Sequence, residues 1–174
     1  MSTAYTDNIK GCDGLRIWQI NCRREVKTPP KRPKVLGQVT VVQWLAIRND
    51  PRLIVCFGTT LGYLCFWRQD SEGDYEEFAT ERIGDGKEIL SIEGDKPTLK
   101  DVRFVVGSLC GQVQLWKCDN NGNLSTIFAV TVGGTVPRKV EFSQMTTPPK
   151  SKAKTITVYG FYDGQMYVSF GPID

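Results

Sequence analysis

The residues of this sequence best suited to chemistry are an acidic run, six cysteines and two basic loops. The acidic run lies in and after a turn-like segment and consists of Asp70, Glu72, Asp74, Glu76 and Glu77. Carboxylates hold a cation or transfer protons when they converge in a fixed geometry. A run this local predicts a solvated turn instead, so we expect no metal site and no catalytic acid here.

The chain of 174 residues contains no histidine. Its absence excludes Ser–His and Cys–His catalytic pairs as well as histidine metal sites. The sequence also has no phosphate-binding glycine loop. We therefore expect a protein that is not an enzyme and that uses no metal and no cofactor.

The six cysteines form no C-x-x-C pair, which argues against zinc binding and thioredoxin-like chemistry. Free cysteine is among the most buried residue types, so these are expected to be core residues of strands. Cys56 and Cys65 flank one predicted hairpin, and a disulfide between them stays an open alternative. The full set is Cys12, Cys22, Cys56, Cys65, Cys110 and Cys118.

Two loops share the tetrapeptide TPPK, at 28–31 and at 147–150. Pro-Pro favours extended polyproline structure, and the surrounding cations make both loops basic. Loops 27–34 and 147–154 are therefore candidates to bind phosphate, nucleic acid or an acidic partner, or they are simply solvated. PPKRPK also resembles a nuclear-import signal. The cations are Lys27, Lys31, Arg32, Lys34, Lys150, Lys152 and Lys154.

Length and apolar segments predict a single domain, 1–174, without a targeting or membrane segment. The N-terminus lacks the apolar core of a signal peptide, and the apolar stretch at 39–47 is too short to span a bilayer. The net charge of +3 indicates no class of partner. We expect an intracellular protein with reduced thiols, cytoplasmic or nuclear and not secreted.

A repeat positions these residues. Trp18, Trp67 and Trp116 follow one another at intervals of 49 residues and end the segments GLRIW, GYLCFW and GQVQLW. A fourth copy, GQMYVS, has Ser169 in place of the tryptophan. Glycines keep the same step, in the pairs Gly37 and Gly86, Gly58 and Gly107, and Gly62 and Gly111. A fixed period of this length is typical of a repeat architecture.

Each period reads as four short strands. In the third copy they are predicted at 88–92, 101–107, 111–116 and 124–132, where β-branched and aromatic residues alternate with polar ones. Turn-forming residues separate them. Four strands per period of 40–50 residues are typical of a propeller blade. We expect the tryptophan of each third strand to pack against the next blade.

The third-strand endings GLRIWQ, GYLCFWRQ and GQVQLWKCD resemble those of the WD-repeat family. The glycines that match the Gly-His pair of that family are Gly37, Gly86 and Gly134. The following histidine is replaced by Gln38, Lys87 and Thr135. The aspartate after the tryptophan is replaced by Gln19, Arg68 and Lys117. The buried Asp–His–Ser–Trp network of the family therefore cannot form, and we expect blades held mainly by apolar packing.

The resemblance implies an all-β fold, a WD-repeat-like β-propeller arc of about 3.5 four-stranded antiparallel blades. Blade remnants are predicted at 1–35, full blades at 38–84 and 87–133, and an incomplete blade at 137–172. Closed propellers have about 4–8 blades. The chain is therefore expected to be a fragment of a longer propeller, or to close by pairing with a second copy or with another protein.

The resemblance also implies a function: a non-catalytic protein–protein interaction scaffold that presents its b–c and d–a loops to a protein or peptide partner. Aromatic residues and arginine are favoured anchors of such interfaces. The alternatives are that the apolar loop residues fill the rim between blades, and that the protein binds nucleic acid or phosphate through its basic loops. The candidate partner-binding residues are Leu61, Lys87, Leu109, Arg138, Phe161, Tyr162 and Asp163.

Overall fold

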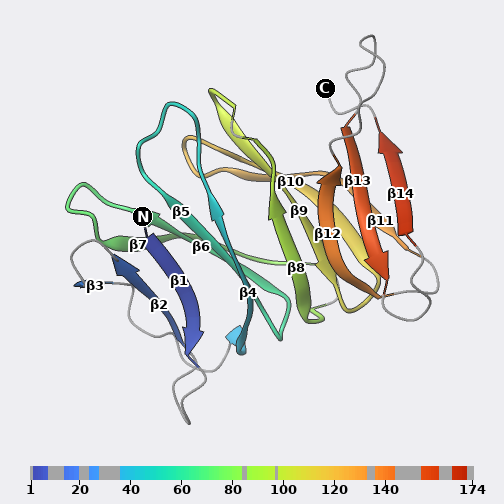
Figure 1. Ribbon diagram of the computed structural model, residues 1–174, viewed down its shortest axis with the longest axis horizontal. Coiled ribbons are helices and arrows are strands. Elements are labelled where there is room, and N and C mark those ends of the chain that lie inside the picture. Colours follow the sequence, from blue (N-terminus) through green and yellow to red (C-terminus); the bar gives the residue numbers. More distant parts are fainter. Residues whose placement is uncertain are drawn as a thin grey trace.

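The computed structural model describes residues 2–7, 14–19, 24–27, 36–83, 86–96, 98–132, 136–143, 154–160 and 166–171. Within these ranges the chain is built from β-strands and contains no α-helix (Figure 1). Side chains of β1, β13 and β14 lie outside the description, so these strands are placed by backbone alone.

The described residues form four antiparallel sheets, each of strands consecutive in sequence. The first sheet contains β1 (Ser2–Asp7), β2 (Gly14–Gln19) and β3 (Arg24–Val26). The second contains β4 (Val39–Leu45), β5 (Ile54–Thr59), β6 (Tyr63–Gln69) and β7 (Tyr75–Arg82). The third contains β8 (Ile89–Gly94), β9 (Asp101–Ser108), β10 (Gln112–Asp119) and β11 (Leu124–Thr131). The fourth contains β12 (Pro137–Ser143), β13 (Lys154–Gly160) and β14 (Met166–Gly171).

The strands predicted for the two central copies are confirmed, and each copy is an antiparallel four-stranded sheet. Local geometry repeats with the sequence. Gly62 and Gly111, 49 residues apart, both have a positive φ, of 76° and 80°. Each follows the second strand of its sheet, where the left-handed backbone that glycine tolerates closes the turn into the third strand.

The first strands of three sheets lie side by side in the middle of the molecule. β8 lies between β4 and β12, although the three belong to different sheets (Figure 1). Side chains link these edges: the hydroxyl of Thr40 donates to the carbonyl oxygen of Ile89 at 2.6 Å. The edge groups of a sheet need such partners, because unpaired backbone groups are costly when buried.

The core lies between consecutive sheets. One cluster joins Phe66 of the second sheet to Phe104 of the third, whose ring centroids are 5.5 Å apart. A second cluster joins Ile17 and Val26 of the first sheet to Trp67 of the second. A third lies between the third and fourth sheets. Both faces of the central sheets are therefore buried, which explains why β5 is buried along its whole length.

The expectation that each tryptophan packs against the next blade is wrong for Trp67 and Trp116, while the side chain of Trp18 lies outside the description. Trp67 lies in the cluster shared with the preceding first sheet, and Trp116 packs against the cluster shared with the preceding second sheet. The residues directly before them, Phe66 and Leu115, face the following sheet. Neighbouring residues of a strand point to opposite faces of the sheet, so the tryptophan faces the preceding sheet and the residue before it faces the following sheet.

Candidate functional site

The described parts of the predicted partner-binding surface lie at one end of the second and third sheets. Leu61 lies in the β5–β6 turn, and Leu109 lies in the corresponding β9–β10 turn. Both side chains are 42% exposed. Exposed leucines at two equivalent turns place apolar surface where a tight turn would ordinarily present polar groups.

Backbone contacts hold each of these turns against the segment that leads into a first strand. The N–H of Thr60 donates to the carbonyl of Gln38, at 2.9 Å. The N–H of Leu109 donates in the same way to the carbonyl of Glu88, at 2.8 Å. The turns are thus built on the strand entries and do not project freely.

The β5–β6 turn, and one repeat later the end of β9, also contact the start of the following sheet. A Cβ built on Gly62 would lie 2.7 Å from Cα of Gly86 and 2.9 Å from the carbonyl oxygen of Lys87. A Cβ built on Gly107 would lie 2.9 Å from the carbonyl oxygen of Pro137. This packing brings the exposed side chains of Lys87 and Arg138 to the end that carries Leu61 and Leu109.

Arg82 joins this group, although the sequence analysis did not select it. It ends β7 with an exposed side chain, and its guanidinium lies 5.6 Å from the ring centroid of Tyr63. A Cβ on Gly86 would collide with that guanidinium. In the sequence, Arg82 could have been selected because it lies four residues before Gly86, one of the glycines that repeat every 49 residues. We call Leu61, Arg82, Lys87, Leu109 and Arg138 the loop end.

The members of the loop end are two leucines and three cations, side chains that can make apolar and ionic contacts. Among the described residues, no group of three or more His, Cys, Asp or Glu could hold a metal ion. Phe161, Tyr162 and Asp163, predicted to belong to the same surface, lie outside the described residues.

The basic loops are represented by little of the described chain. Lys27 is exposed, and its backbone N–H donates to a carboxylate oxygen of Asp74 at 3.1 Å. Lys154 begins β13, whose side chains are not described. The remaining predicted cations, Lys31, Arg32, Lys34, Lys150 and Lys152, lie outside the described residues.

The acidic run is organised around a turn. One carboxylate oxygen of Asp70 accepts the backbone N–H groups of Glu72 and Asp74, both at 2.9 Å. Asp119, one repeat later, accepts those of Asn121 and Asn123 in the same way, at 2.8 and 2.9 Å. The side-chain amide of Asn123, which donates to the other carboxylate oxygen of Asp119 at 2.9 Å, lowers the pKa of Asp119 most, and the backbone hydrogen bonds lower it further. Within the acidic run, Asp70 therefore has a structural role, because its carboxylate caps the turn between β6 and β7.

Three of the four described cysteines are core residues, as expected, whereas Cys110 is partly exposed in the β9–β10 turn and not in a strand. Cys56 and Cys118 belong to the cluster between the second and third sheets, whereas Cys65 belongs to the cluster on the opposite face. Cys56 pairs across the hairpin with Phe66, not with Cys65. Their side chains point to opposite faces of one sheet, so the alternative of a Cys56–Cys65 disulfide is wrong, and both are free thiols. Cys12 and Cys22 lie outside the described residues.

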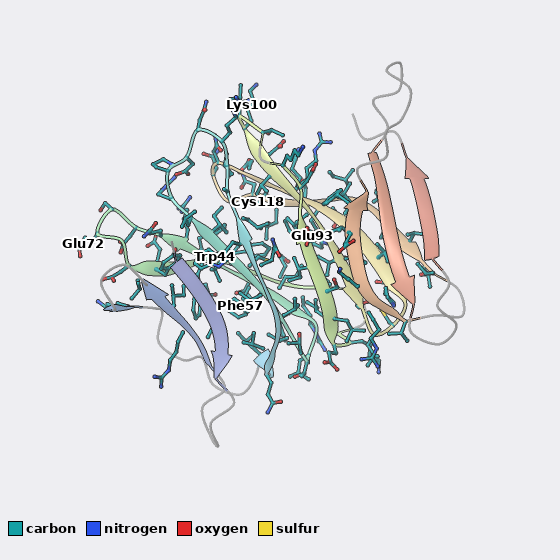
Figure 2. The ribbon with its side chains drawn as sticks, viewed as in Figure 1. Trp44, Phe57, Glu72, Glu93, Lys100 and Cys118 are labelled. Carbon is teal, nitrogen blue, oxygen red and sulfur yellow. The ribbon has the colours of Figure 1, made fainter. Side chains whose placement is uncertain are left out.

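A carboxylate pair lies on the central strands, away from the loop end. Burial raises the pKa of Glu93 on β8, and the negative charge of Glu141 on β12 raises it further, while Lys139 opposes this effect. Figure 2 shows the side chain of Glu93 reaching from β8 towards β12. Lys139 and Glu141 form an ion pair. The positive charge of Lys139 offsets part of the negative charge of the two glutamates, and all three residues lie where β8 packs against β12.

Comparison with protein-family models finds no match for this chain, and comparison with curated proteins finds none either. In the part of the chain that the structure describes, no helix is long and apolar enough to cross a membrane.

Proposed function

We propose that this protein is a non-catalytic interaction scaffold of WD-repeat type, in which an arc of about 3.5 propeller blades presents the loop end to a protein or peptide partner. The architecture is supported by consecutive meander sheets that repeat every 49 residues. The arrangement of β4, β8 and β12 supports it too, because the first strands of propeller blades surround a common axis.

One observation carries the binding proposal: leucines exposed at 42% occupy equivalent turns of two neighbouring sheets. Apolar side chains in turns cost little when isolated, but two of them on one end of a repeat array form a ready contact surface. The neighbouring cations Arg82, Lys87 and Arg138 favour a partner that combines apolar anchors with acidic residues.

The test compares partner capture by matched variants. We expect the wild-type chain, immobilised in a lysate of the cells that make it, to enrich one or a few proteins in quantitative mass spectrometry. The double variant Leu61→Ser and Leu109→Ser should lose that enrichment. Leu99→Ser is the control, because Leu99 is also exposed, at 54%, but lies in the β8–β9 loop beside Lys100 at the opposite end (Figure 2).

The proposal fails if the Leu99 variant loses the same proteins, or if the double variant keeps them. The salt dependence of binding distinguishes protein binding through the loop end from nucleic-acid binding through the basic loops. Enrichment of the protein partner should survive moderate salt, because apolar anchors are not screened. Binding of DNA or RNA that weakens steeply with salt would instead favour the basic loops 27–34 and 147–154.

A further inference from the structure

The outer edges of the two four-stranded sheets differ in chemistry. β7 and β11 occupy the same place in their sheets, each paired on one side with the third strand. Four of the eight residues of β7 are charged: Glu76, Glu77, Glu81 and Arg82. β11, with the sequence LSTIFAVT, has no charged residue.

Charge is the ordinary protection of an edge strand. An edge presents a row of unpaired N–H and C=O groups, and charged side chains prevent another strand from adding to it. β7 carries this charge and β11 does not, although each strand contains a β-bulge, which also blunts an edge. Both strands have eight residues, and β11 is rich in β-branched residues, which favour strand pairing.

The repeat relates a covered side chain on β7 to an exposed one on β11. Phe78 of β7 and Ile127 of β11 are equivalent: each is the additional residue at the register shift with the third strand. The guanidinium of Arg68 lies 5.1 Å from the ring centroid of Phe78, and a Cβ on Gly122 would lie 2.7 Å from that ring. Ile127 stays 40% exposed, and Val130 of the same strand is 37% exposed.

We propose that β11 pairs antiparallel with β11 of a second copy of this chain. A two-fold axis between the strands would place each strand against its own sequence. Self-pairing requires that no like charges meet, a condition that the neutral β11 satisfies and that β7, with three glutamates, does not. The edge supplies backbone hydrogen bonds, and Ile127 and Val130 supply apolar contact with the partner strand.

A second copy fits this edge better than a charged peptide does. β11 offers Ser, Thr and aliphatic side chains, which match one another across a pair of strands. It has no ionic group with which to select a partner of opposite charge. Because one pair of strands buries a small area, the dimer is expected to be in exchange with the monomer. The inference does not depend on the loop end, which belongs to other strands.

The test measures mass against concentration by light scattering and sedimentation for the wild type and three variants of the full chain. We expect a wild-type monomer–dimer equilibrium. Ile127→Lys should raise its dissociation constant at least tenfold, because two lysines then meet in the paired edge. Ile127→Thr, which stays neutral and β-branched, should keep the dimer. Leu99→Lys, the same kind of change at another exposed site, should leave the mass unchanged.

Circular dichroism and thermal melting of each variant establish that the fold is retained, which the exposure of Ile127 favours. A wild type that stays monomeric at every concentration overturns the proposal. So does self-association, of any size, that Ile127→Lys leaves intact, since it would use other edges. Complex formation only with a different protein, abolished by Ile127→Lys, would also overturn it and assign the edge to that partner.

Discussion

The hydroxyl of Ser91 on β8 accepts a hydrogen bond from the backbone N–H of Val140 on β12, at 3.0 Å in a buried position. The two residues are 49 apart, one repeat of the sequence. β12 is the first strand of its sheet, so the N–H of Val140 is an edge group. A side chain of the neighbouring sheet thus satisfies it, and this bond helps to fix how the third and fourth sheets meet.

Replacement of this hydroxyl tests the contact. Ser91→Ala should lower the free energy of unfolding by about 1–3 kcal/mol, because it leaves a buried N–H without a partner. Urea denaturation measures the change. Ser125→Ala is the control, since Ser125 is exposed on β11 and should shift stability by less than about 0.5 kcal/mol. Equal effects from the two changes would show that the Ser91–Val140 bond contributes nothing specific.

Gly58 tests the close approach between sheets. A Cβ on this residue of β5 would lie 2.6 Å from Cγ2 of Ile89 on β8. Gly58→Ala should therefore destabilise the fold by about 1–3 kcal/mol through overpacking. A loss of this size in thermal or urea unfolding would confirm the contact.

Gly73→Asn is the control for Gly58. Gly73 has a φ of 88°, but a Cβ there would meet nothing closer than 3.5 Å. Asparagine tolerates that backbone, so the cost should stay below about 1 kcal/mol. If Gly73→Asn costs more than Gly58→Ala, backbone conformation and not space between β5 and β8 limits substitution.

Thiol labelling should separate the cysteines by their position. Burial raises the pKa of Cys118 to about 12 and raises that of Cys56 as well. At pH 8 neither should form the reactive thiolate. Cys110, which is partly exposed in the β9–β10 turn, should react with iodoacetamide before Cys56 and Cys118 do, as measured by peptide mass spectrometry. Labelling of Cys56 as fast as Cys110 under native conditions would contradict the buried placement.

Glu93 makes stability depend on pH. Its pKa is raised in the folded protein, so the folded state keeps this proton to a higher pH than the unfolded chain does. The free energy of unfolding should therefore fall as pH rises from about 4.5, the ordinary value, through the folded pKa. Glu93→Gln should remove that decline and be more stable than the wild type at pH 7.

Denaturation curves recorded between pH 4 and pH 8 measure how Glu93 changes the free energy of unfolding. The matched change Glu72→Gln, at an exposed turn position, should leave the shape of the stability profile as in the wild type. A Glu93→Gln profile that declines with the wild-type slope would show that another group is responsible.

Much of the secondary structure was predictable from sequence. β-Strand propensity, turn residues and the step from Trp67 to Trp116 predicted the strands of both central sheets. These signals are local, because a strand of alternating side chains and a glycine in a turn depend on a few neighbouring residues. The same step also predicts that Leu61 and Leu109 occupy equivalent turns.

The direction in which side chains pack was not predictable in the same way. Alternation shows that Phe66 and Trp67 point to opposite faces, but not which neighbouring sheet each face meets. Only the assembled sheets decide that Trp67 faces the preceding one. The acidic run was expected to form a solvated turn, and a turn is present. That Asp70 caps this turn was not predictable, because a hydrogen bond depends on backbone orientation and not on composition.

The sequence by itself determined the strands, their turns and the period that relates them, since propensity and spacing act within one repeat. Tertiary structure alone decided that the Ser91 hydroxyl meets the Val140 N–H, that Gly58 must admit Ile89, and that Ile127 stays uncovered where Phe78 is covered. The first two relations join residues of different sheets, and the third depends on what packs against the third sheet. They follow from how the sheets pack against one another, a global arrangement that no single repeat encodes.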